Sequence, residues 1–129
     1  MNSTSNLSRI FLALSALVFF VIGASIFRDP FIGMAGTELQ PLTVSAFNEV
    51  RANYGGLQIA IGLMLLNGAF RTHWRRQALW ISVAVTGGLL GGRLISIGID
   101  GLPNTFTAGL VWLEAIATII ATVLLWRTR

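Results

Sequence analysis

One arginine and one glutamate stand within apolar runs, far from the chain's other charges. Arg93 lies in the stretch GGLLGGRLISIGIDG, and Glu114 lies in the apolar stretch that follows it. A charged side chain near the middle of a membrane span costs about 2.5–3.5 kcal/mol and usually faces a partner inside the protein. We therefore predict that Arg93 and Glu114 form an ion pair between neighbouring helices.

A second polar group begins an apolar segment earlier in the chain. At about 100° per residue, Arg51, Tyr54 and Gln58 share one stripe of a helix, and Glu49 and Asn53 share the roughly opposite stripe. We expect the first stripe to face inward, because Gln58 lies deepest and would lose most by facing lipid. Glu49 lies near enough to the end of the segment to reach water.

The predicted polar cluster therefore has six members, which are Glu49, Arg51, Tyr54, Gln58, Arg93 and Glu114. Two interpretations of it stay open. It forms an outward-facing pocket that binds a small anionic or amphipathic ligand or handles protons through Glu114, or it forms a buried network that fixes the register of the helices. We favour the structural interpretation, because charge within a membrane span is by itself only a hint of function.

Residue types and spacing give little support to catalysis or metal binding. No serine, histidine and acid combination has a placement suited to nucleophilic chemistry. The single histidine, His73, lies in an arginine-rich connection, and no pair of acids lies at a depth that could hold a metal. Without cysteine there is no thiolate ligand and no disulfide. We expect no cofactor and no metal. The residues favour a protein without enzyme activity, and a membrane-embedded enzyme is kept as a third alternative.

The composition is that of a membrane protein. Of 129 residues, 54% are hydrophobic and 11% are charged, and the mean hydropathy is +0.75, which is too apolar for an ordinary soluble domain. Four apolar stretches are long enough to cross the hydrocarbon core as helices; they cover about residues 7–27, 44–70, 78–99 and 104–126. We predict one all-α transmembrane domain over residues 1–129, an up-down-up-down four-helix bundle.

The first stretch also has features of a secretory signal. Arg9 precedes its apolar core, and the core ends in the small residues Gly23, Ala24 and Ser25. The apolar stretch is long for a signal, which favours a retained span.

The placement of the arginines predicts the orientation. Arg9 precedes the first stretch, Arg71, Arg75 and Arg76 lie between the second and third, and Arg127 follows the fourth. Positive residues in short connections are retained on the cytoplasmic side. We expect both termini in the cytoplasm and the polar cluster in the outer half of the membrane.

Turn residues predict that the third and fourth stretches form a tight antiparallel hairpin. Asp100, Gly101 and Pro103 lie between them, and glycine accepts a positive φ while proline suits a first helical turn.

Small residues predict close helix packing. They are Gly55 and Gly56 in the second stretch and Gly87, Gly88, Gly91 and Gly92 in the third. We expect packing within the bundle, since the later glycines adjoin Arg93; dimerisation is the alternative.

The order of these polar residues resembles a known family. The chain contains Glu49-x-Arg51-Ala52-x-Tyr54-Gly55-Gly56, then Gly92-Arg93, Asp100-Gly101 with Pro103, and Glu114. This pattern is similar to the small bacterial membrane proteins grouped as domain of unknown function 4345, and it covers nearly all of the chain after the first helix. The resemblance implies a four-helix protein of the bacterial inner membrane. The architecture is also similar to DoxX-like four-helix bundles, by analogy of fold.

Two functions compete. Short connections and the missing catalytic residues favour an accessory, structural or assembly subunit that packs against a larger membrane complex or a second copy. The alternative is a carrier, transporter or sensor of a small ligand, in which Arg51 and Arg93 supply charge and Tyr54 and Gln58 supply orientation. In either case we expect membrane lipid, and not nucleic acid, around the chain.

Overall fold

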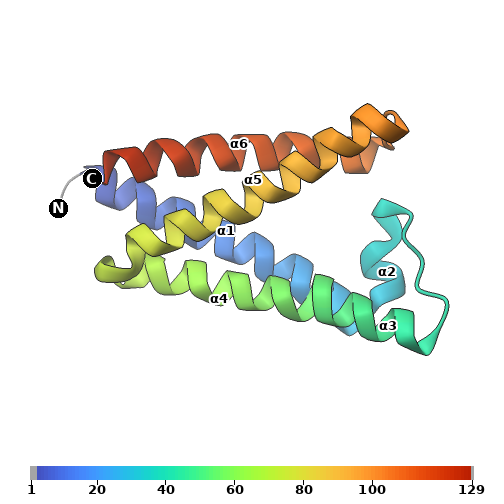
Figure 1. The fold of residues 1–129 in the computed structure, drawn as a ribbon. Helices are drawn as coiled ribbons and strands as arrows, with labels where there is room; N and C mark the ends of the chain where they lie inside the picture. The colour runs from blue at the N-terminus through green and yellow to red at the C-terminus, as the bar shows by residue number, and fades with distance from the viewer. Residues whose placement is uncertain (1–2, 129) are drawn as a thin grey trace.

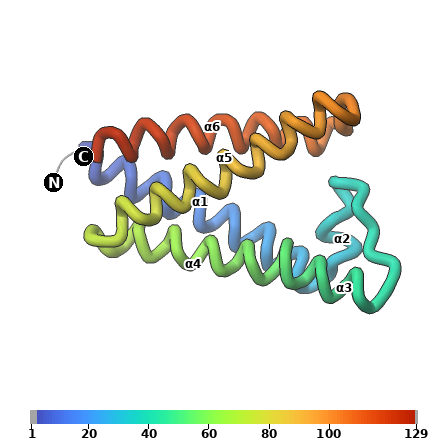
Figure 2. Tube along the Cα trace, viewed as in Figure 1, coloured from blue at the N-terminus to red at the C-terminus, as the bar shows by residue number. Residues whose placement is uncertain are grey.

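The chain folds into helices joined by short connections. The computed structural model describes residues 3–128; residues 1–2 and 129, the two ends of the predicted domain, lie outside the described part. Within that part every regular element is a helix, and the start of α1 and the end of α6 lie at the same end of the molecule (Figure 1, Figure 2).

Within residues 3–128, three helical stretches are long and apolar enough to cross a membrane, which indicates a membrane protein. The first is α1 (Ser3–Arg28) and the last is α6 (Thr105–Arg127). The second is α5 (Arg75–Asp100), which the short 3-10 helix η3 (Thr72–Trp74) extends at its start. α1 and α5 begin three or four residues before the predicted apolar stretches, because polar residues at a helix end can face the boundary and water, whereas α6 is shifted by only one residue from its predicted bounds.

The segment expected as the second span is helical throughout but not uniform. It consists of α3 (Val44–Val50), a π-helical turn η2 (Arg51–Gly56) and α4 (Leu57–Phe70). Thr43 caps its start by accepting a hydrogen bond from the Ala46 amide at 3.1 Å. Hydropathy does not distinguish a π turn from an α turn, so the sequence indicated one helix where the structure has three pieces.

A short helix that the sequence analysis did not predict folds back on the end of α1. This is α2 (Pro30–Met34), followed by the 3-10 helix η1 (Ala35–Thr37). The Asp29 carboxylate accepts hydrogen bonds from the amides of Phe31 and Ile32, both at 3.1 Å. Acid at the cap and proline at the first helical position are a strong start signal.

The helices pack as two pairs that meet most closely near the termini. α1 lies along α4, and α5 runs from the end of α4 across to α6 (Figure 1). Near the termini Leu12, Leu65 and Leu79 are fully buried and belong to one hydrophobic core. Further along α1, a Cβ at Gly23 would lie 2.8 Å from the carbonyl oxygen of Gly55. Glycine is therefore required where α1 approaches the π turn.

The hairpin between α5 and α6 is tight, as its turn residues indicated. Gly101 has a φ of 97°, and the Asn104 side chain caps α6 by accepting from the Thr107 amide at 2.8 Å. Pro103 lies before this cap and not in the first helical turn, where it was expected. The Asn104 amide also donates to the Gly36 carbonyl oxygen at 3.0 Å, which joins the hairpin to η1.

The glycines of α5 do not pack as expected. A Cβ at Gly88, Gly91 or Gly92 would have no neighbour within 4 Å, and one at Gly87 would meet only Thr118, at 3.5 Å. Because Arg93 faces α6, the residues just before it point to the other sides of α5. The glycines therefore do not face the bundle interior merely because they adjoin Arg93 in the sequence.

The two glycines of the π turn also differ from each other. Gly55 is buried against Phe27, with 3.0 Å between the added Cβ and the phenylalanine Cβ, whereas Gly56 would meet only the Arg51 carbonyl oxygen, at 3.6 Å. Of the pair, Gly55 brings helices together.

Candidate functional site

A cavity of about 630 Å³ lies between the two helix pairs. Its walls come from α1, from η2 and α4, from α5 and from α6, and η1 adds to one end. On α1 it extends from Phe11 to Ile26 and on α6 from Phe106 to Ile120, which corresponds to about 20 Å along the helices. Most of the lining is apolar. Small-molecule sites typically measure about 300–1,000 Å³ and combine an apolar lining with a few polar groups.

Arg93 and Glu114 form an ion pair in the wall of this cavity. The Arg93 Nε lies 2.9 Å from both Oε1 and Oε2 of Glu114. The Glu114 side chain is 9% exposed and the Arg93 side chain 28%. The carboxylate is thus enclosed, whereas part of the guanidinium is open to the cavity.

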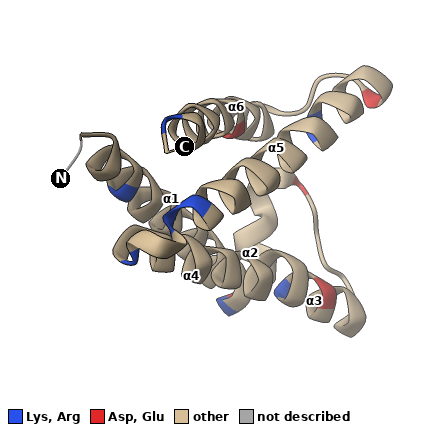
Figure 3. Cartoon of the chain, turned by 60° about the vertical axis from the view of Figure 1, so that its left-hand side comes forward, with Lys and Arg blue, Asp and Glu red and all other residues tan. Residues whose placement is uncertain are grey.

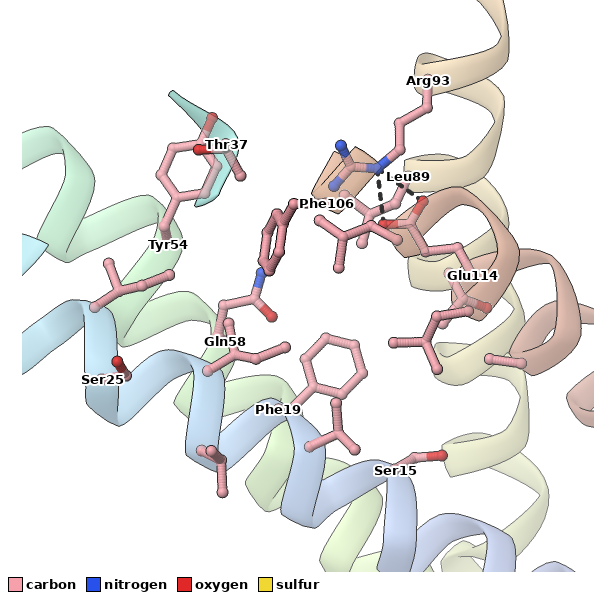
Figure 4. A pocket seen from close by; sticks show the side chains of 18 of the residues that line it. Ser15, Phe19, Ser25, Thr37, Tyr54, Gln58, Leu89, Arg93, Phe106 and Glu114 are labelled. Carbon is pink, nitrogen blue, oxygen red and sulfur yellow. Dashed lines mark hydrogen bonds and ion pairs between the residues drawn. The ribbon is translucent and has the colours of Figure 1, made fainter. Parts of the chain in front are cut away.

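The open part of Arg93 consists of its two terminal nitrogens. Figure 4 shows them pointing away from the Glu114 carboxylate, toward the space that Tyr54, Gln58 and Phe106 surround. A guanidinium carries five N–H donors, and the bond to Glu114 uses only the one on Nε. Within residues 3–128 the terminal nitrogens donate to no protein group, so they are available to a ligand.

Tyr54 and Gln58 face the same space from the opposite wall. They come from η2 and α4, and both line the cavity. In Figure 4 the Gln58 amide points toward the centre, and the drawn hydrogen bonds are those between Arg93 and Glu114. Phenol and amide groups both donate and accept hydrogen bonds. At this end of the cavity, Tyr54 and Gln58 offer both donors and acceptors on one wall, and the terminal nitrogens of Arg93 offer donors on the other.

The other two predicted members, Arg51 and Glu49, lie outside the cavity. Arg51 Nε donates to the Phe27 carbonyl oxygen at 3.0 Å, and its guanidinium lies 5.8 Å from the Phe47 ring centroid. Glu49 is exposed and accepts a hydrogen bond from the Asn53 amide at 3.0 Å.

The reason for the separation of Arg51 from Tyr54 is the π turn to which both belong. A π turn holds more residues than an α turn, so spacing at 100° per residue fails across it. The inward stripe predicted for Arg51, Tyr54 and Gln58 is therefore wrong at its first member.

The turn residue Asp100 also lies away from the cavity. It accepts a hydrogen bond from the Ser96 hydroxyl at 3.0 Å on the exposed end of α5.

Two threonines that the sequence analysis did not single out join the same helices below the ion pair. Thr118 Oγ1 lies 2.8 Å from Thr86 Oγ1, and 2.7 Å from the Glu114 carbonyl oxygen. Thr86 Oγ1 donates to the Ser82 carbonyl oxygen at 2.8 Å. Hydrogen bonds of this kind hold membrane helices together. The signal in the sequence is their spacing, two turns before Arg93 and one turn after Glu114.

Among the arginines of residues 3–128, Arg75 is the most enclosed, and it has a structural role. Its Nε and Nη2 donate to the Gly68 and Ala69 carbonyl oxygens at 3.3 and 3.2 Å, and its Nη1 donates to Ser5 Oγ at 2.6 Å. Carbonyls in the last turn of a helix have no intrahelical partner and carry partial negative charge. Arg75 therefore stabilises the end of α4 and connects it to α1. The sequence analysis missed this role because Arg75 lies in a group of arginines that was interpreted only as setting the orientation.

The comparisons with known proteins define the family. No curated protein and no solved structure gave a match. A family model described as Domain of unknown function (DUF4345) matches residues 7–125, a range that includes every cavity residue from Phe11 to Ile120. Because the match covers most of the chain, it shows that the chain belongs to the DUF4345 family.

Proposed function

We propose that this protein binds an amphipathic small molecule inside a bundle of membrane-spanning helices and acts as a carrier or sensor of it. The observation that carries the proposal is the cavity of about 630 Å³ with a polar end and a long apolar remainder. A register-fixing ion pair needs no cavity beside it, and it leaves no guanidinium donors turned toward open space.

The proposed setting is a four-helix bundle in the bacterial inner membrane, with the segment from α3 to α4 as the fourth span. The arginines at the start of α1, around η3 and at the end of α6 lie at the end of the molecule that carries both termini, whereas the acidic residues, together with Arg28, Arg51 and Arg93, lie further along the helices (Figure 3). Trp74, Trp80 and Trp126 are exposed near this end, where indole rings suit a membrane boundary. These features support cytoplasmic termini. In the proposed orientation the polar end of the cavity lies in the outer half of the membrane.

The cavity opens sideways between α1 and α6. Val18 and Val21 on α1, and Leu113 and Ile116 on α6, line the cavity and are also 42–61% exposed. Side chains that are both lining and exposed mark the mouth of a cavity, and in a bilayer this mouth faces acyl chains. An amphiphile already dissolved in the membrane can reach the site without passing through water.

Filling the cavity tests the proposal. Ala117 lines it, whereas Ala84 is exposed on the far side of α5. The protein is reconstituted in nanodiscs with methyl palmitate or palmitate, and bound probe is measured by native mass spectrometry. Ala117→Phe should abolish binding of whichever probe binds, and Ala84→Phe should leave it unchanged. If binding survives Ala117→Phe, or if neither probe binds the wild-type protein, the proposal is contradicted.

An accessory role in a larger membrane complex is the second candidate function, and one observation favours it. Gly88, Gly91 and Gly92 leave an uncovered patch on α5 that a helix of another protein could approach closely. Purification in mild detergent should then give a large complex that Gly91→Leu dissociates. A stable monomer in the same detergent argues against this role.

A further inference from the structure

The charges in the cavity already balance. Arg93 and Glu114 are the charged residues of its lining, and their 2.9 Å contact makes one neutral pair. Arg51 is the other arginine of the predicted polar cluster, and it donates to the Phe27 carbonyl oxygen and does not face the cavity. A ligand therefore meets a site with strong hydrogen-bond donors and no net charge.

The donors that remain on Arg93 specify what the ligand's head must supply. Its terminal nitrogens face the cavity and have no protein acceptor among the described residues. A polar N–H enclosed in apolar surroundings without an acceptor is costly, and the apolar lining offers none. The head of the ligand must bring an acceptor oxygen to Arg93.

Two kinds of head have such an oxygen, an anion and an uncharged carbonyl. An anion at the terminal nitrogens would stand beside the Glu114 carboxylate, which already neutralises the guanidinium, and would leave one uncompensated negative charge away from water. An uncharged carbonyl satisfies the same donors and keeps the site neutral. Tyr54 and Gln58 on the opposite wall can complete its hydrogen bonds.

We infer that the cavity selects a long-chain amphiphile with an uncharged, carbonyl-type head, and that Glu114 sets this selectivity by neutralising Arg93. The inference rests on the proposed function and names the class of its ligand. The carbonyl lies at Arg93, and the chain extends along the apolar lining toward Phe11 and Ile120, within a cavity whose full length along the helices is about 20 Å.

The experiment compares two probes with the same chain and different heads. Methyl palmitate carries an uncharged ester, and palmitate carries a carboxylate. Binding to the full chain in nanodiscs is measured at about pH 9, where a carboxylate stays ionised even if the membrane raises its pKa. Partition into empty nanodiscs is subtracted. Methyl palmitate should bind at least about tenfold more tightly than palmitate, a difference that one uncompensated charge readily gives.

Removing the Glu114 charge should reverse the preference. In Glu114→Gln the guanidinium is unpaired, so palmitate should become the tighter probe by about tenfold or more. The matched control is Glu49→Gln, which removes an exposed carboxylate outside the cavity and should keep the preference for the ester. Arg93→Gln combined with Glu114→Gln restores a neutral site, and should again prefer the ester but bind it more weakly.

The outcomes separate the inference from the function on which it rests. If the wild-type protein binds both probes and holds palmitate as tightly as the ester, the inference is overturned and the proposed function stands. An unchanged preference in a folded Glu114→Gln variant also overturns it. If neither probe binds, both fall. Because the wild-type comparison needs no variant, poor folding of Glu114→Gln does not remove the test.

Discussion

Arg93 and Glu114 meet although they are not level along their helices. Thr86 and Thr118, whose hydroxyl oxygens are 2.8 Å apart, mark one level on α5 and α6. From there Arg93 is about 10 Å further along α5, and Glu114 about 6 Å back along α6. Side chains lean toward the N-terminus of their own helix, and α5 and α6 are antiparallel. The two side chains therefore lean toward each other and close the offset.

Breaking this pair should destabilise the protein, and removing it whole should cost less. Glu114→Gln leaves the guanidinium without its counter-charge, and we expect a loss of about 1–3 kcal/mol in the free energy of unfolding. Adding Arg93→Gln should recover part of the loss. Equilibrium unfolding in mixed micelles measures both, with Glu49→Gln as the neutral control. A double variant less stable than either single one contradicts this account.

The threonine contact should contribute modestly. A double-mutant cycle of Thr86→Val and Thr118→Val should give a coupling free energy of about 0.6 kcal/mol, the average for such pairs between membrane helices. The Thr122 hydroxyl donates within its own helix, to the Thr118 carbonyl oxygen at 2.7 Å. A cycle of Thr86→Val with Thr122→Val should therefore show coupling near zero.

Glycine positions that look alike in the sequence should respond differently to alanine. Gly23→Ala places a methyl group 2.8 Å from the Gly55 carbonyl oxygen, and overpacking of this kind costs about 1–3 kcal/mol. Gly88→Ala meets open space and should be neutral or stabilising by up to about 1 kcal/mol, since alanine favours helix. Thermal unfolding of the two variants in the same detergent gives the comparison. Equal melting temperatures would be incompatible with the packing of α1 on the π turn.

The guanidinium of Arg75 should not be replaceable by an ammonium group. Arg75→Lys keeps the charge but cannot reach two carbonyls and a hydroxyl at once, so we expect a loss of about 2–3 kcal/mol in stability. Arg76 is exposed and makes one 3.4 Å hydrogen bond, to the Thr128 carbonyl oxygen, so Arg76→Lys is the matched control. Unfolding curves that coincide for the two variants would exclude this role for Arg75.

The proposed orientation can be tested with single cysteines, because the chain has none of its own. Leu102 is 89% exposed at the tip of the α5 and α6 hairpin, and His73 is exposed in the connection after α4. A membrane-impermeant maleimide should label Leu102→Cys in spheroplasts and His73→Cys only after lysis. The reverse pattern would place both termini outside the cytoplasm.

Hydropathy and charge placement were sufficient to predict helical segments and to single out Arg93 and Glu114. An apolar stretch of this length is stable in a membrane mainly as a helix, and a lone charge within it needs a partner inside the protein, so both are predictable from sequence. What failed depended on local rotation. Whether Gly88 faces a helix or open space, and whether Arg51 shares a stripe with Tyr54, depends on the angle of a residue about its axis. The pattern of apolar residues leaves that angle poorly determined where most positions are apolar.

Other features were missed because their signals were ambiguous. The pair Asp29-Pro30 could have predicted α2, but a basic and an acidic residue before proline also suit a simple chain turn. Arg75 stands among other arginines, so only packing distinguishes it.

The π turn implies that the segment from Arg51 to Gly56 holds one residue more than a plain α-helix of the same rise would need. If the same residues instead formed an uninterrupted α-helix, α3 would be rotated by about 100° relative to α4. That rotation would turn Arg51 away from the Phe27 carbonyl oxygen and alter the charge balance at the open end of the cavity. A single surplus amino acid thus keeps a second guanidinium out of the cavity.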